Sequence, residues 1–161
     1  MKASRRLCRC PRAWASLALA TALLAPAARA ATYRVDDAAT IVENTVLKMR
    51  WRNVAPSRRA DNAVLGTTRV NVRLNLAAWQ HRNARLYLVL PMQPPAPLVA
   101  RWTTQGRLQP GEVVSGQRTL VYAGPVTAPV LDETLVLQLE ADGQQLETPH
   151  RIDFHFEIDV E

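Results

Sequence analysis

Two absences limit what this chain can be. Cysteine occurs twice, at Cys8 and Cys10, and the chain from Ala31 onward contains none. Disulfide bridges, thiolate catalysis and cysteine-based zinc sites are therefore excluded from that part. Its fold must rely on a hydrophobic core, and from Ala31 to Glu161 the chain is long enough to form one. Acidic residues are also absent before Asp36, which sets the first segment apart.

The motifs of catalysis and of nucleotide binding are also missing. Ser57 and Ser115 are the only serines after residue 30, and neither lies in a G-x-S-x-G sequence. No glycine-rich nucleotide loop is present. Asp132-Glu133 and Asp36-Asp37 are carboxylate pairs by adjacency only, and adjacent strand residues point to opposite faces. We therefore expect no enzyme activity and no cofactor.

The first thirty residues have the three parts of a secretory signal. Five basic residues precede an apolar run from Ala13 to Ala25, and a small-residue site, Ala28-Arg29-Ala30, follows. A retained membrane anchor is the alternative, but the apolar run is shorter than the roughly 20 residues that a membrane span needs. We expect 1–30 to be a cleaved signal peptide that exports a bacterial protein to the periplasm or beyond, with no stable membrane span afterwards. The Arg5-Arg6 pair leaves general secretion and twin-arginine export both open.

Removal of that segment changes the charge of the protein. The chain has 20 Lys and Arg, 14 Asp and Glu and a net charge of +6, and six of the basic residues but none of the acids precede Ala31. The remaining chain is therefore balanced, and its charge gives no support to a nucleic-acid partner.

Alternation of apolar and polar residues dominates the chain after residue 30. It is clearest in Leu47–Arg52, Arg69–Leu76 and Ile152–Glu161. Such alternation indicates strands with one buried and one exposed face. The segments 86–90 and 135–139 are nearly continuous apolar runs that suit central strands, and 98–102, 119–122 and an edge strand at 32–35 complete the set.

Turn signals separate these strands at short intervals. They include Pro110-Gly111, Ser115-Gly116 and Asp142-Gly143, the last predicting a hairpin whose returning strand lies near Gln145–Thr148. The longest predicted loop is Asn53–Gly66. The sequence therefore predicts residues 31–161 to form one all-β domain, an immunoglobulin-like antiparallel sandwich of about seven or eight strands.

The balanced charge hides an uneven distribution. Ala31–Arg107 is strongly basic and Leu108–Glu161 is strongly acidic. One interpretation is internal pairing, in which Lys48, Arg50 and Arg52, or Arg69 and Arg73, lie beside Asp153, Glu157 and Asp159. The other is external: the basic surface, including the loop residues Arg58 and Arg59, binds an acidic partner or a second copy head to tail.

Two further features could bind a small ligand or a metal. Trp79 and Trp102 lie at strand ends and could stack on a sugar if both are exposed at one end of the sandwich. His155 lies between Asp153 and Glu157 on one strand face, but the spacing matches no known ligand motif, and we predict no metal site.

These observations favour an exported, non-enzymatic β-sandwich. It would act by protein–protein contact in the cell envelope or a surface appendage, through edge-strand pairing or charge-guided docking. The partner would be an envelope or appendage protein, or the protein itself. A carbohydrate-binding module is the first alternative, and a small hydrolase is the second.

Overall fold

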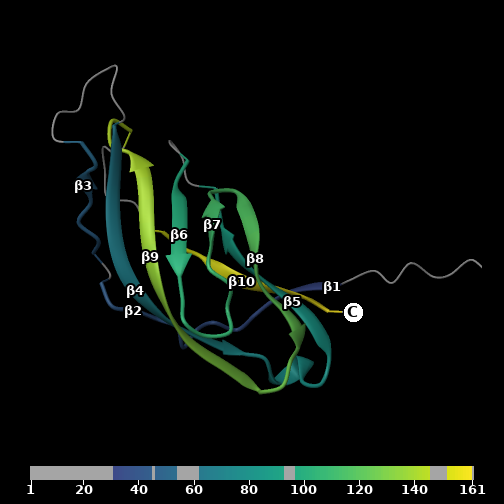
Figure 1. Ribbon diagram of the computed structural model, residues 1–161. Coiled ribbons are helices and arrows are strands. Elements are labelled where there is room, and N and C mark those ends of the chain that lie inside the picture. Colours follow the sequence, from purple (N-terminus) through teal and green to yellow (C-terminus); the bar gives the residue numbers. More distant parts are fainter. Residues whose placement is uncertain (1–30, 45, 54–61, 93–96, 146–151, 161) are drawn as a thin grey trace, which may run out of the picture.

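The computed structural model describes residues 31–44, 46–53, 62–92, 97–145 and 152–160. Within these ranges the chain is almost entirely strand, arranged in two antiparallel sheets (Figure 1). The prediction of an all-β sandwich is confirmed. The predicted signal peptide, 1–30, lies outside the described residues.

Sheet A has four strands in the order β1-β10-β5-β8. They are β1 (Ala31–Arg34), β10 (His155–Val160), β5 (Asn83–Leu90) and β8 (Gln117–Pro125). The first and last strands of the described chain are neighbours, because Ala31 pairs with Val160.

Sheet B is larger and has the order β2-β4-β9-β6-β7, with β3 also paired to β4. The strands are β2 (Ile41–Val42), β3 (Arg50–Trp51), β4 (Ala63–Asn75), β9 (Val130–Asp142), β6 (Val99–Thr103) and β7 (Gly111–Val114). Its centre is the long β4–β9 pair, in which 13-residue strands are matched along their whole length. The short helical turn η1 (Ala77–Trp79) follows β4.

The core lies between the sheets and follows the predicted alternation. Along β4 the side chains of Val70, Val72 and Leu74 are buried, while the residues between them are exposed. On β10 the buried residues are Phe156, Ile158 and Val160. Burial of large aliphatic and aromatic side chains such as these is the main stabilising term of a cysteine-free domain.

Several boundaries differ from the sequence prediction. β4 begins at Ala63, so the C-terminal end of the predicted loop 53–66 belongs to a strand. β7 lies between two segments that read as turns, and β10 begins at His155, three residues after the alternation starts. Trp51, predicted to be core, is 45% exposed, because β3 lies at an edge of sheet B. The predicted return strand after Asp142-Gly143 falls mostly outside the described residues.

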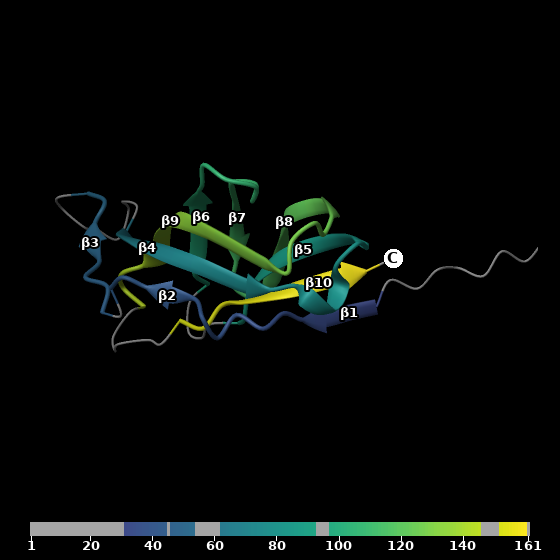
Figure 2. The same ribbon diagram turned by 90° about the horizontal axis from the view of Figure 1, so that it is seen from below.

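The two sides of the sandwich are closed differently. On one side β7 and β8 follow each other through the Ser115-Gly116 turn, and Thr119 Oγ1 donates a 2.7 Å hydrogen bond to the carbonyl of Glu112. On the other side the chain passes from β1 in sheet A to β2 and β3 in sheet B (Figure 2). That side is therefore closed by an extended N-terminal segment held by short pairings. No helix in the described part of the chain has the length and hydropathy of a membrane span.

Candidate functional site

The predicted basic contact surface is only partly described. Lys48, Arg50 and Arg52 lie on and beside β3 and are exposed. Arg52 forms an ion pair of 2.6 Å with Glu140 of β9. Arg58 and Arg59, the loop residues of the same hypothesis, lie outside the described residues.

Charges from the basic and acidic parts of the chain meet on the outer face of sheet B. Arg73 pairs with Asp132 at 3.1 Å, and Arg101 pairs with Glu112 at 3.0 Å and also with Glu140. The hydrogen bond from Arg101, together with Arg52, outweighs burial and holds the pKa of Glu140 below its ordinary value. Internal pairing thus accounts for part of the uneven charge, as one interpretation predicted.

The prediction that the first basic strands lie beside the acids of β10 was wrong. Glu157 and Asp159 lie on sheet A, whereas Arg50, Arg69 and Arg73 belong to strands of sheet B. Tertiary structure instead brings Arg118 of β8 across β5 to both acids.

Arg118 joins the acids of β10 into one network on the outer face of sheet A. Its guanidinium lies 3.3 Å from Glu157 and 3.2 Å from Asp159, and 4.3 Å from the centre of the Tyr87 ring. Burial raises the pKa of Asp159, but hydrogen bonds from Thr32 and Arg118 outweigh it, so that the pKa lies below the ordinary value. The network therefore ties the edge strand β1 to the centre of sheet A.

His155 adjoins this network through Glu157. Its Nε2 lies 3.6 Å from Glu157. The described residues contain no group of three His, Cys, Asp or Glu side chains placed to hold a metal ion.

Among the described residues, sheet A ends at β1 with an exposed edge strand. All four residues of β1 are exposed, and the strand pairs on one side with β10. Val35 donates a 2.8 Å hydrogen bond to the carbonyl of Phe156, so that these two residues form a hydrogen-bonded pair. Antiparallel pairs alternate, and the N–H and C=O groups of Thr32 and Arg34 therefore point away from β10, toward the open edge.

Glu133 binds the loop between β6 and β7, unlike its sequence neighbour Asp132. Its carboxylate accepts hydrogen bonds from the N–H groups of Arg107 at 2.8 Å, Leu108 at 3.0 Å and Gly106 at 3.2 Å, and from Thr104 Oγ1. Asp132 instead pairs with Arg73, so the two adjacent acids act separately, as strand geometry predicts. Glu133 anchors the β6–β7 loop, and the sequence carries no local signal of this.

The two tryptophans proposed for ligand stacking are not exposed together. Trp102 is 2% exposed, and its indole N–H donates a 2.8 Å hydrogen bond to the carbonyl of Gln109. Trp79 is half-buried, with its ring centre 6.0 Å from that of Tyr33, which is 48% exposed. Trp102 therefore belongs to the core, whereas Tyr33 and Trp79 form an aromatic pair that is partly exposed.

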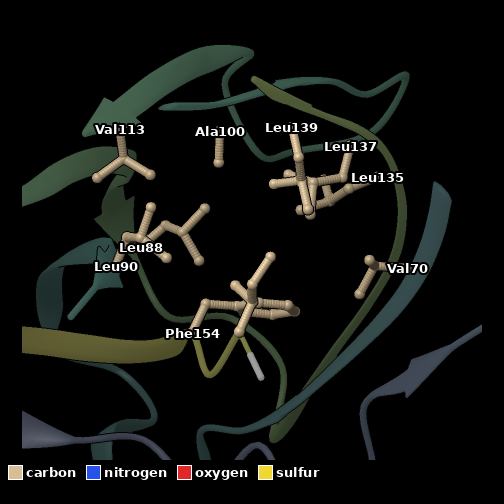
Figure 3. Close-up of a pocket in the computed structure, with 10 residues that line it drawn as sticks. Val70, Leu88, Leu90, Ala100, Val113, Leu135, Leu137, Leu139 and Phe154 are labelled. Carbon is tan, nitrogen blue, oxygen red and sulfur yellow. The ribbon is translucent and has the colours of Figure 1, made fainter. Parts of the chain in front are cut away.

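A small apolar cavity lies between the sheets (Figure 3). Its lining includes Val70 and Leu137 from sheet B, Leu88 from sheet A, and Phe154 just before β10. The volume is about 10 Å³, close to the room that one water molecule needs. The cavity is a packing gap, far smaller than a site for a sugar or a drug-sized molecule.

The chain matches no known protein family, no curated protein and no solved structure.

Proposed function

We propose that this protein is an exported, non-enzymatic β-sandwich that binds protein partners in the bacterial envelope or a surface appendage. The outer edge of β1 is the contact. The observation that carries the proposal is the open backbone of Thr32 and Arg34 on a fully exposed edge strand. An extended segment of a partner adds to such an edge by main-chain hydrogen bonds.

The order of the strands supports an immunoglobulin-like version of the sandwich. β2-β4-β9-β6 follows the A-B-E-D order of that fold, and β5 and β10 take the C and F places. β1 then stands beside β10 in the place of the G strand, although it comes first in the chain. β8 departs from the pattern, because it pairs with β5 yet follows β6 and β7 in sequence.

Edge pairing has more support than charge-guided docking. Arg52, Arg73 and Arg101 are paired with acids on the outer face of sheet B, which lowers the charge offered to a partner. A head-to-tail contact between two copies would also be weaker, because these arginines are already paired with acids of their own copy.

The test compares two substitutions at Arg34 in the tagged full-length chain, expressed in its native host. Arg34→Pro removes the outward N–H, and proline is tolerated on the free side of an edge strand. Arg34→Ala removes the same side chain and keeps the N–H. Captured proteins are identified after in-cell cross-linking.

We expect Arg34→Ala to capture the same proteins as the parent and Arg34→Pro to lose them, with both variants folded by circular dichroism. Equal capture by the proline variant, or no specific capture by the folded, exported parent, would overturn the proposal.

The Tyr33–Trp79 pair favours a second candidate, a carbohydrate-binding module. An exposed tyrosine beside a tryptophan offers an apolar surface to a sugar ring. A glycan array probed with the parent and with Tyr33→Ala tests it. Binding that the substitution abolishes would support this candidate, and the absence of binding by the parent would remove it.

A further inference from the structure

We propose that the partner strand at the outer edge of β1 is β1 of a second copy of this chain, paired antiparallel about a two-fold axis that passes beside Tyr33. This inference rests on the edge-pairing function proposed above and names its partner.

The alternation of β1 decides which residues can pair. Only Thr32 and Arg34 direct their backbone groups outward, because Tyr33 and Ala31 use theirs on Ile158 and Val160 of β10. A second copy meets the same restriction. Each outward residue must therefore be matched with an outward residue of the partner.

Three registers satisfy this condition, and one is clearly best. Placing Arg34 opposite the partner's Arg34 brings like charges together, and it matches Thr32 with Asp36, whose carbonyl already accepts a 3.0 Å hydrogen bond from Asn75. Placing Thr32 opposite the partner's Thr32 matches Arg34 with a residue before β1. Placing Thr32 opposite the partner's Arg34 uses both outward residues of both copies, each pair exchanging two hydrogen bonds.

This register puts Tyr33 opposite the partner's Tyr33. The two then form a non-hydrogen-bonded pair, in which side chains approach most closely, with Cα atoms about 4.5 Å apart. Tyr33 is 48% exposed in the single copy. Pairing covers this aromatic surface, and aromatic cross-strand pairs stabilise a sheet.

Arg34 also finds complementary charge in this register. Its side chain lies on the same face as Thr32, whose hydroxyl is bonded to Asp159. Arg34 therefore stands in one row with the partner's Asp159, two strands away across the partner's Thr32, at a backbone separation of about 10 Å. On its own copy Arg34 stands opposite Glu157.

The joined molecule would have one continuous sheet of eight strands, with β1 and its copy at the centre. β1 lies at the outside of sheet A, where a second sheet can continue it (Figure 2). The contact is short, so it is weak in dilute solution and is best detected by covalent capture.

The experiment uses the full chain, expressed with its own leader, carrying Tyr33→Cys. A Cα separation of about 4.5 Å falls within the range that a disulfide bridges. The chain from Ala31 onward contains no cysteine, and the parent, with Cys8 and Cys10, gives the background. Gln138→Cys, at an exposed position on sheet B, is the matched control.

We expect mild oxidation to give several-fold more covalent dimer for Tyr33→Cys than for Gln138→Cys. A copy with Thr32→Cys and a second copy with Arg34→Cys, each carrying a tag of a different size, should be mixed and oxidised. The dimer that contains one of each should form in preference to either homodimer. Adding Arg34→Pro to Tyr33→Cys should reduce the dimer to background.

A Tyr33→Cys dimer no stronger than the control would overturn the second-copy proposal. If Arg34→Pro still abolished capture of another protein, the edge-pairing function would stand with a different partner. A dimer that persists in the proline variant would also overturn the proposal, because its backbone pairing would be wrong.

Discussion

Thr32 and Asp159 face each other across β1 and β10, and Thr32 Oγ1 donates a 2.5 Å hydrogen bond to Asp159 Oδ1. The two residues form a non-hydrogen-bonded pair of the ladder, where side chains are closest. This contact joins the exposed edge strand to the Arg118 network. It therefore ties the proposed contact surface to the stability of sheet A.

Thr32→Val should loosen β1. The substitution keeps the shape of the side chain and removes the donor, at an expected cost of about 1 kcal/mol in the free energy of unfolding. Urea unfolding measures the loss. Thr134→Val, which removes a 2.9 Å bond between exposed neutral groups, is the control and should cost less. An equal cost for both would show that the charge of Asp159 adds nothing.

The protein should lose stability in acid through Asp159 and Glu140. Both carboxyls have a folded-state pKa below the ordinary value. They therefore contribute stability that is present above the unfolded-state pKa of about 4 and is lost as the pH falls through the folded-state values. Urea midpoints measured from pH 6 to pH 2 should fall over that window.

Removing one partner should flatten this acid dependence. Glu140→Gln and Arg101→Gln each break the same pair, so both should give a shallower fall in urea midpoint below pH 4 than the parent. Arg50→Gln, at an exposed position on β3, is the matched control. A fall unchanged in Glu140→Gln would mean that other groups cause it.

The Glu133 anchor leaves little room for a side chain at position 106. A Cβ atom added to Gly106 would overlap the Glu133 carboxyl group. We expect Gly106→Ala to cost about 1–3 kcal/mol in unfolding free energy, and Gln105→Ala, exposed in the same loop, to cost about 0.5 kcal/mol or less. In a Glu133→Ala background the Gly106→Ala cost should shrink, because the overlap is gone. Full additivity would contradict this account.

Trp102 should behave as a core residue. Trp102→Phe removes the indole N–H that bonds to Gln109 and leaves a gap in a buried site, so the free energy of unfolding should fall by about 1–3 kcal/mol. Thermal or urea unfolding measures this. A variant as stable as the parent would show that the indole is not needed for packing.

Local alternation was sufficient to predict much of the sheet structure. Val70, Val72 and Leu74 on β4, and Phe156 and Ile158 on β10, are buried as their period of two indicates. The reason is local, since successive strand side chains point to opposite faces whatever the rest of the chain does. The separation of Asp132 from Glu133 followed from the same rule.

Tertiary structure decided what the side chains meet. Trp51 continues an apolar alternation yet is half-exposed, because β3 lies at an edge and little packs over it. Trp102 precedes polar residues yet is buried, because β6 lies inside sheet B, between β9 and β7. Burial depends on the neighbours of a strand, which its own sequence does not specify.

The sequence by itself determined the strand character of this chain, its freedom from disulfides and the balance of its charges after residue 30. Only the tertiary structure decided that Arg118 binds Glu157 and Asp159, that Glu133 holds the β6–β7 loop, and that β1 forms an edge beside β10. These contacts join residues far apart in the chain. Strand order and register set them, and neither is encoded in the local alternation of residues.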